Sequence, residues 1–336
     1  MTGLCEHYRQ AGGLHTRIVP MCYSAIIKQQ IKKLSVQYDA RIDYELLQNM
    51  FYRRLTDDRI KICKALEAEF DEPENVDEKE IRELIKAYQK VKLKEIELDL
   101  AKQEERLRVA EEALRLKETK KFLNEKRIAN NHIEKLLQRI KAQRRSELIP
   151  TDSRVFPMTY APIIIRENDQ NTIKLARYHC RPADKPADID TKYNGLYNAR
   201  RDNLGNAFWR NLFGHKHGFF VAQSFYENVS ALNYKPAPHT DDRNLVVQFT
   251  PQSKKDLKIA CLYDYWESTP EDGFYSFAAL THEPTPEIVH AGHDRLIIAL
   301  KEENLAMWLD PEKFSLEEMG RVLDEAEAHI YEHTIS

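Results

Sequence analysis

Residues 198–227 read NARRDNLGNAFWRNLFGHKHGFFVAQSFYE, and this stretch joins a cluster of polar groups to a strand-like apolar run. It places an amide at Asn198 and guanidinium groups at Arg200 and Arg201, and the apolar run ends on Glu227. A carboxylate that leaves an apolar strand is a candidate for a raised pKa, because desolvation disfavours its charged form. We therefore expect Glu227 to be suited to proton transfer near neutral pH. The plainer alternative is a solvated basic loop followed by a core strand with an exposed carboxylate.

The composition sets the broad class of the protein. The 336 residues are 42% hydrophobic and 31% charged, with a net charge of -3. This balance excludes a uniformly basic nucleic-acid binder but allows a local basic groove. The five cysteines are scattered without CxxC spacing, which is typical of a reduced intracellular compartment. No apolar run is long enough to span a bilayer, and residues 1–20 lack the apolar core of a secretory signal. We expect a cytoplasmic protein with no membrane partner.

The first half of the chain reads as helical. Residues 1–20 show no periodicity and are expected to be a leader outside the mature protein. From about Ser24 to Leu66 the apolar spacing predicts two amphipathic helices, broken near residues 39–43. Residues 71–150 are rich in charges of both signs, and a seam of heptad spacing runs through Leu93, Ile96, Leu100, Leu107, Ala110 and Leu114. The seam fits a helical hairpin or a continuous dimeric coiled coil. We favour the hairpin, with its turn where the phase slips at residues 122–131.

The second half reads as strands. After Pro150 the chain becomes β-branched, aromatic and punctuated by proline. Seven strands are expected, at 161–166, 172–178, 218–227, 244–250, 257–266, 273–281 and 295–300. A last helix, from about Ser315 to Tyr331, opens on the capping box Ser315-Leu316-Glu317-Glu318. The prediction is an α+β fold with a curled antiparallel sheet or barrel and flanking helices. Its domains are a core of residues 21–70 and 151–315, the insertion 71–150 and a C-terminal helix at 316–336.

The histidine pairs invite a metal site, which we do not predict. Neither His215-Lys216-His217 nor His290-Ala291-Gly292-His293 has helical i, i+4 spacing, and no carboxylate stands at a recognised ligand offset. No other cofactor is indicated. His293 alone precedes an apolar strand, so its ring is expected at a strand mouth, where a general acid is useful.

Cys22 allows two interpretations. A free cysteine is usually a buried small hydrophobe. If the mature chain begins at Cys22, through a start at Met21 or cleavage of the leader, this residue instead carries an α-amine and a thiol on adjacent carbons. The α-amine has a pKa of about 7.7 to 8.0 and is partly unprotonated at neutral pH. Such a pair can condense with an aldehyde and close a thiazolidine ring.

The motifs together resemble the SOS-response-associated peptidase (SRAP) family of abasic-site-processing proteins. They are Met21-Cys22, Asn198-Ala199-Arg200, Trp209-Arg210, Ser224-Phe225-Tyr226-Glu227, Ile259-Ala260-Cys261-Leu262-Tyr263, His293-Asp294-Arg295 and Trp308-Leu309-Asp310-Pro311. The resemblance covers residues 21–70 and 151–312. It implies covalent crosslinking to abasic sites in single-stranded DNA, and self-processing peptidase activity. The implied catalytic set is Cys22, Asn198, Glu227 and His293, and Arg200 and Arg295 are implied phosphate contacts.

Further expectations concern DNA and protein partners. We expect Arg210 to hold a flanking phosphate, and Trp209 to stack on a base or else to lie in the core. The chain departs from the family pattern at Tyr23-Ser24, where Gly-Arg is usual, around Glu227 and after His293. These departures and the helical insertion indicate a divergent branch. The insertion is expected to bind a protein partner or a second copy, and association with the nucleoid would follow DNA binding. A peptidase acting on protein substrates and a noncatalytic coiled-coil protein are the alternatives.

Overall fold

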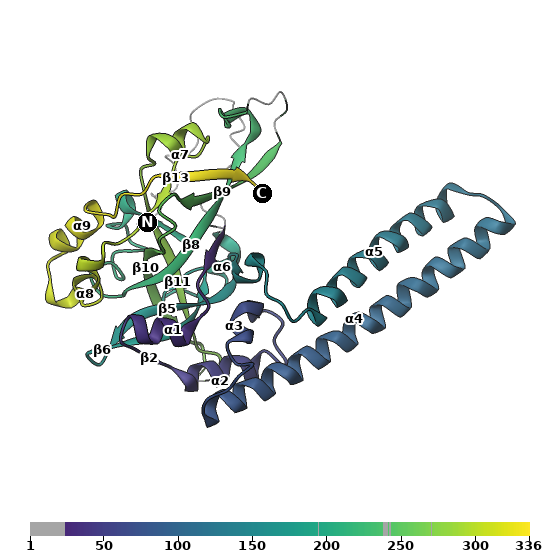
Figure 1. Cartoon of the computed structure of the whole chain (residues 1–336), viewed down its shortest axis with the longest axis horizontal. Coiled ribbons are helices and arrows are strands. Elements are labelled where there is room, and N and C mark those ends of the chain that lie inside the picture. The colour runs from purple at the N-terminus through teal and green to yellow at the C-terminus, as the bar shows by residue number, and fades with distance from the viewer. Residues whose placement is uncertain (1–23, 194, 238–240, 242, 270) are drawn as a thin grey trace, which may run out of the picture.

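A closed five-stranded β-barrel forms the centre of the molecule (Figure 1). The computed structural model describes residues 24–336 except 194, 238–240, 242 and 270. The barrel strands, in order around the ring, are β8 (His217–Ser230), β10 (Leu257–Trp266), β11 (Phe274–His282), β6 (Gln170–Tyr178) and β5 (Thr159–Glu167), and β5 pairs again with β8. All neighbours are antiparallel except β6 and β11, which run parallel. The predicted α+β class with a curled, barrel-like sheet is confirmed, and the parallel pair is a detail that strand patterns alone do not reveal.

Side chains alternate between the two faces of the barrel strands. Ile163, Ile165 and Phe220 belong to one buried cluster, whereas Ile164 and Phe219 belong to another. This alternation follows from the period of two in a β-strand. The cluster that contains Ile164 also gathers residues of the helices, so that face of the strands is the helix-covered outside. The other cluster fills the inside of the barrel.

Strand β8 extends beyond the barrel and organises a second group of strands. Its first half pairs with β10, and its second half pairs with β9 (Asn244–Pro251) and β1 (Ser24–Ile27). Strand β13 (Tyr331–Ile335) then pairs with β9. The remaining short strands are β2 (Ala40–Ile42), β3 (Lys61–Ile62), β4 (Arg154–Val155), β7 (Asn198–Arg200) and β12 (Leu296–Ile297). The prediction of helix from Ser24 is therefore wrong at its start, because the apolar run Ser24–Ile27 is buried on every residue against β8.

The N-terminal helices cover the outside of the barrel. Helix α1 (Ile31–Gln37) and helix α2 (Tyr44–Arg53) are separated by β2, as the break near residues 39–43 predicts. Asp43 caps α2, since its side chain accepts a hydrogen bond from the Leu46 N–H at 3.0 Å. The other short helices are α3 (Lys64–Ala68), α6 (Ile189–Lys192), α7 (Pro286–His290) and α8 (Leu305–Trp308).

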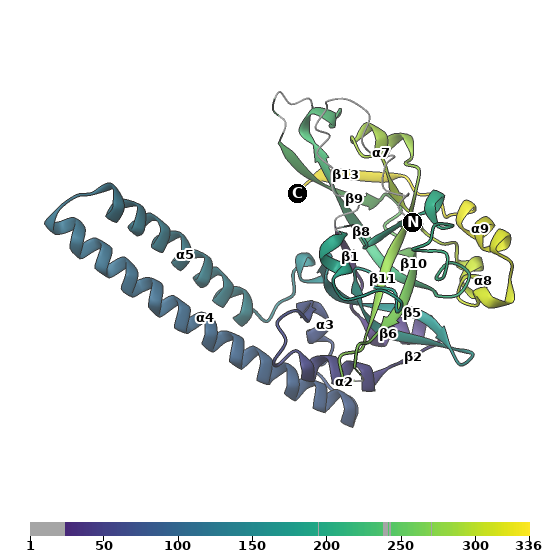
Figure 2. The same cartoon turned by 180° about the vertical axis from the view of Figure 1, so that it is seen from behind.

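Two long helices project from the body as a hairpin (Figures 1 and 2). Helix α4 (Val76–Leu116) and helix α5 (Lys120–Arg144) run antiparallel, joined at residues 117–119. The turn comes earlier than the phase slip at 122–131 suggests, because Thr119 caps α5 by accepting from the Phe122 N–H at 3.3 Å. Ile96 and Ala110 of the predicted seam are buried.

The C-terminal segment is only partly helical. Helix α9 (Leu316–Asp324) begins at the predicted capping box, in which the Glu318 N–H donates to Ser315 Oγ and the Ser315 N–H donates to the Glu318 carboxylate. The helix ends at Asp324 instead of continuing to Tyr331. Residues 331–335 form β13, which pairs with the backbone of β9, and the Tyr331 ring meets Phe225 edge-to-face at 5.3 Å. No helix among the described residues has the length and apolar character to cross a membrane.

Candidate active site

Glu227 and His293 form a buried contact on the second half of β8, the part that pairs with β9. Glu227 lies opposite Val247 of β9 and has no exposed surface. His293 follows α7 through a turn and is also buried. The Nε2 atom of His293 is 3.1 Å from Oε2 of Glu227. A carboxylate and an imidazole in this arrangement, removed from water, can pass a proton between them and to a third group.

Gly292 makes the turn that presents His293. Its φ of 86° lies in the left-handed region, where side chains are strained. A Cβ at this position would approach the carbonyl oxygen of Asn233 to 2.6 Å and the side chain of Val229 to 2.7 Å. Glycine is therefore required both by the backbone angle and by the space, and the position of the His293 ring depends on it.

Burial disfavours the protonated form of the His293 ring. Desolvation lowers the pKa of His293, and the backbone contact with Arg295 opposes this shift only in part. The Nδ1 atom lies 3.2 Å from the Arg295 N–H, which can donate to it, and 3.0 Å from the Arg295 carbonyl oxygen. In the neutral tautomer that carries its proton on Nε2, Nδ1 accepts from the Arg295 N–H, and Nε2 lies 3.1 Å from Oε2 of Glu227. This tautomer holds a transferable proton on the side of Glu227.

The chain enters the described part of the fold beside Glu227. Strand β1 pairs Ser24 with Tyr226 and Ala25 with Phe225. Arg154 fixes this entry point, because its Nε donates to Ser24 Oγ at 3.0 Å and its guanidinium lies 3.6 Å from the centre of the Tyr226 ring. Cys22, the predicted nucleophile, lies two residues before Ser24 and outside the described residues.

Asn198 lies on β7 and is buried. Its side-chain oxygen accepts a hydrogen bond from the Tyr178 hydroxyl at 3.2 Å. The Tyr178 ring stacks on Phe277 with a centroid distance of 5.1 Å, so the donor is held by packing inside the barrel. The amide of Asn198 is thereby oriented by a side chain that sequence analysis did not single out.

Arg200 and Arg295 flank the same end of β11. Thr281 pairs with Arg200 on one side and with Ile297 of β12 on the other. Arg200 is bound by Asp202, at 2.9 Å from Nε, and Arg295 by Glu283, at 2.6 Å from Nη1. Both acidic partners are largely exposed. An exposed carboxylate is a weak competitor, so a phosphate could replace Asp202 on the 38% exposed Arg200 side chain, whereas the Arg295 side chain is only 9% exposed.

Arg210 and Trp209 occupy different environments although they are adjacent. Arg210 is exposed and available to a phosphate. Trp209 is 5% exposed and belongs to the same buried cluster as Ile164, on the outside of the barrel. Its ring packs edge-to-face on Phe208 with a centroid distance of 4.5 Å. The Trp209 ring would have to leave this core to stack on a base. The packing therefore favours the prediction that Trp209 lies in the core.

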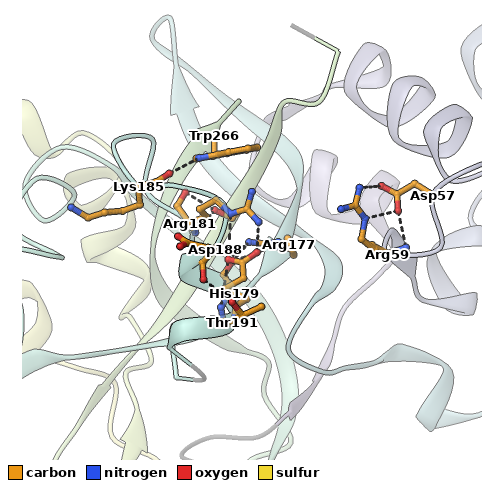
Figure 3. A network of polar contacts seen from close by, with 11 residues as sticks. Asp57, Arg59, Arg177, His179, Arg181, Lys185, Asp188, Thr191 and Trp266 are labelled. Atoms are coloured by element: carbon orange, nitrogen blue, oxygen red, sulfur yellow. Dashed lines mark hydrogen bonds and ion pairs between the residues drawn. The ribbon is translucent and has the colours of Figure 1, made fainter. Parts of the chain in front are cut away.

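A second polar network lines a cavity of about 470 Å³, and Figure 3 shows its residues Arg177, His179 and Arg181. Asp190 accepts from Arg177 at 2.8 and 3.1 Å and also from Arg181. Burial alone would raise the pKa of Asp190, but hydrogen bonds from Arg181 and Arg177 lower it. The same burial, together with Arg177, lowers the pKa of the neighbouring His179 to about 4. This network ties residues 179–193 to the barrel strands and holds fixed charges instead of a group that titrates near pH 7.

The residues that support the candidate site and that sequence analysis missed are Arg154, Tyr178 and Gly292. Arg154 contacts Ser24 across the whole helical insertion, so no local pattern links the two. The glycine of His290-Ala291-Gly292-His293 was the one available signal, because glycine directly after a short helix often marks a left-handed residue. Among the described residues, no group of three or more His, Cys, Asp or Glu side chains could hold a metal ion.

The barrel and the long shared strand β8 thus bring a buried carboxylate-imidazole pair next to β1, the first described strand. The family model described as SOS response associated peptidase (SRAP) matches residues 116–336, and the chain belongs to this family. Membership associates the protein with the response to DNA damage and with peptidase-like activity. The matched residues include Asn198, Glu227 and His293, and they begin after most of α4.

Three solved structures are similar to the chain at low identity. A protein from Bacteroides thetaiotaomicron is 16% identical with a TM-score of 0.42, over 52% of this chain and 73% of that one. A protein from Bordetella bronchiseptica is 16% identical with a TM-score of 0.45, over 57% and 89%. A phage-related protein from Bordetella bronchiseptica is 15% identical with a TM-score of 0.42, over 55% and 80%. No curated protein matches the chain.

Proposed function

We propose that this protein forms a covalent thiazolidine crosslink with abasic sites in single-stranded DNA through Cys22. The observation that carries the proposal is the 3.1 Å contact between Glu227 and His293 beside the strand on which the chain enters the fold. Ser24 is paired with Tyr226, the neighbour of Glu227, and two peptide units span at most about 7 Å. This short separation along the chain supports Cys22 as the nucleophile of the proposal. Family membership supports the same chemistry.

The reaction needs an amine, a thiol and a proton shuttle. The ring-opened abasic sugar carries an aldehyde at C1′, and the α-amine of Cys22 attacks this carbon to give a carbinolamine. Protonation of the hydroxyl by His293 or Glu227 lets it leave as water and produces the imine. The thiolate of Cys22 then adds to the imine carbon, and the nitrogen takes a proton to complete the ring. The net change is the loss of one water molecule.

Asn198 and the arginines hold the substrate in this scheme. The amide of Asn198, oriented by Tyr178, would polarise the sugar oxygen or orient the amine. Arg200 and Arg295 would bind the phosphates on either side of the damaged sugar, and exposed Arg210 a more distant one. Charge-assisted hydrogen bonds of this kind make the affinity depend on salt. Proximity to the amine would then supply much of the rate enhancement.

The chemistry requires that Cys22 be the first residue of the active protein. An amide nitrogen within a chain cannot close the ring, so residues 1–21 must be absent. We propose a core of residues 21–70 and 151–315, interrupted by the insertion 71–150. Removal of the leader by the same site, acting on the Met21-Cys22 bond, would link the crosslink to the peptidase activity of the family.

The test is an SDS-resistant adduct with an oligonucleotide that contains one abasic site. A protein that begins at Cys22 should form the adduct, and the Cys22→Ala variant and the full-length chain held uncleaved should not. A protease acting on protein substrates would instead show thiol-dependent cleavage without DNA and no adduct. An adduct that persists in Cys22→Ala would refute the proposal.

A further inference from the structure

The outward face of α4 carries a stripe of exposed apolar side chains. Val91, Leu98, Val109 and Leu116 are 46%, 55%, 48% and 91% exposed. Eighteen residues make five full turns of an α-helix, so Val91 aligns with Val109, and Leu98 aligns with Leu116. Seven residues fall only about 20° short of two turns. The four side chains therefore form one straight line, which we call the outer stripe, about 38 Å long at 1.5 Å per residue.

The outer stripe lies on a different face from the contacts that α4 already makes. Ile96 and Ala110 are buried on the side of α5, and Ile81 and Ile85 are buried against the body. Five residues turn a helix by about 140°, so Ile96 is well separated from the direction of Val91. Next to the stripe, a groove of about 420 Å³ between α4 and α5 contains Val109, Ala110 and Phe122. Half-exposed aliphatic side chains in this pattern are typical of a helix that packs on another helix.

The outer stripe matches itself in its apolar positions and in its central charges when two copies run antiparallel. We propose that a second copy of this chain packs antiparallel along it, with a two-fold axis between residues 103 and 104. Each residue then faces the one that is equally distant from this midpoint in the other copy. The facing pairs are Val91 with Leu116, Leu98 with Val109, and Lys102 with Glu105. Every apolar residue of the stripe meets an apolar residue, and the central polar positions meet with opposite charge.

The charges along α4 favour the same arrangement. Glu105 and Glu112 share one cation, since both lie 2.6 Å from Arg108 of their own helix. Lys94 and Lys102 are exposed and have no ion-pair partner among the described residues. One half of the stripe thus has surplus positive charge and the other half surplus negative charge. In this antiparallel register Lys102 faces Glu105, and Glu112 faces Glu95, which is paired with Lys92 of its own helix, with Lys94 on the next residue. A parallel pair would place Lys102 against Lys102. A second copy is the occupant that this symmetry selects.

The first experiment measures self-association of the full chain by sedimentation equilibrium across the micromolar range. We expect a reversible dimer, and Leu98→Glu should raise its dissociation constant at least about a hundredfold, because each interface loses two buried leucines. Glu104→Lys is the matched control, since Glu104 is exposed on the same turn of α4 but points away from the stripe. It should leave the dissociation constant unchanged. A chain that stays monomeric, or a dimer indifferent to Leu98→Glu, overturns the proposal.

The second experiment tests the orientation by charge reversal. Lys102→Glu and Glu105→Lys should each raise the dissociation constant about tenfold, because two facing pairs change from attraction to repulsion. The double variant Lys102→Glu/Glu105→Lys restores both pairs and should return the dissociation constant to within about twofold of the original. A parallel pair, or another protein or DNA as the occupant, would show no such rescue, and that result would overturn the antiparallel dimer. Circular dichroism should give equal helix content in all variants.

Discussion

Oε2 of Glu227 lies 3.1 Å from Nε2 of His293, and the carboxylate has no exposed surface. The two residues come from a strand and from the turn after α7, and they meet where β8 leaves the barrel. Because both groups are buried, the site is suited to hold one proton on the ring or on the carboxylate. The predictions below start from this pair and from the elements that hold it.

Replacement of Glu227 by glutamine should slow crosslinking while preserving the fold. Glutamine keeps an oxygen that can accept from Nε2 of His293 but cannot carry the proton. General acid-base groups contribute about a hundredfold to ten-thousandfold in rate, so we expect at least a loss of about a hundredfold. Single-turnover adduct formation measures the rate, and thermal unfolding checks the fold. An unchanged rate in a folded Glu227→Gln protein would remove this residue from the mechanism.

Replacement of Gly292 by alanine should destabilise the protein and slow crosslinking together. The left-handed φ and the 2.6 Å approach to the Asn233 carbonyl force the backbone to move, at a cost of about 1 to 3 kcal/mol. The same movement displaces His293. Gly205→Ala is the matched control, because a Cβ there meets nothing within 4 Å. Urea unfolding of both variants gives the comparison, and equal stabilities would contradict the turn's role.

Substitution of Trp209 should affect stability, whereas substitution of its neighbour Arg210 should affect DNA binding. Trp209→Ala removes a buried ring from the core and should cost about 3 to 5 kcal/mol of unfolding free energy. Arg210→Ala removes an exposed cation and should leave stability unchanged while weakening binding to single-stranded DNA and lowering its salt dependence. Urea unfolding and salt-dependent fluorescence anisotropy measure the two effects. A Trp209→Ala protein with full stability but weak DNA binding would restore the base-stacking role.

Acid should destabilise the fold through buried histidines, of which His217 is the clearest. Burial lowers the pKa of His217 to about 3, and its Nε2 accepts from the Gly214 N–H at 2.8 Å. The unfolded chain therefore binds a proton that the folded chain does not, and stability is lost as the pH falls from about 6.5 towards 3. Each such group contributes a slope of about 1.4 kcal/mol per pH unit within this window.

Urea unfolding between neutral pH and about pH 4 checks this dependence. His217→Gln should reduce the slope by one proton, whereas His132→Gln, on the exposed face of α5, should leave it unchanged. A slope that is the same in His217→Gln as in the original protein would show that this histidine is protonated in the folded state.

Sequence patterns predict the parts of this fold that depend on local periodicity. The six long strands after Pro150, the capping box at Ser315 and the helical hairpin all follow from such patterns. The short strands β4 and β7 are not predicted, and the strand predicted at 295–300 is confined to β12 (Leu296–Ile297). The parallel pairing of β6 with β11 and the strand at Ser24–Ile27 do not, because they depend on partners far away in the chain. The predicted C-terminal helix is too long, because residues 331–335 form β13 and pair with the edge of β9.

The same division applies to the candidate site. Glu227 after an apolar run and the histidine before a strand are visible as sequence features, and the structure brings them into contact. The strand does not end at Glu227 as predicted, because β8 continues to Ser230 along β9. Their supporting residues are not visible, because Arg154 acts across the insertion and Tyr178 acts across the barrel. Trp209 shows that one sequence feature can fit two roles, since an aromatic residue next to an arginine is typical both of a base-stacking surface and of a buried core.

The most direct test of the central claim is the intact mass of the adduct between an abasic-site oligonucleotide and the protein that begins at Cys22. The account predicts a single species whose mass equals protein plus DNA minus one water, absent in Cys22→Ala and formed slowly by Glu227→Gln. An adduct that maps to a lysine or to another cysteine, or no adduct with a protein proven to carry a free α-amine at Cys22, would contradict it.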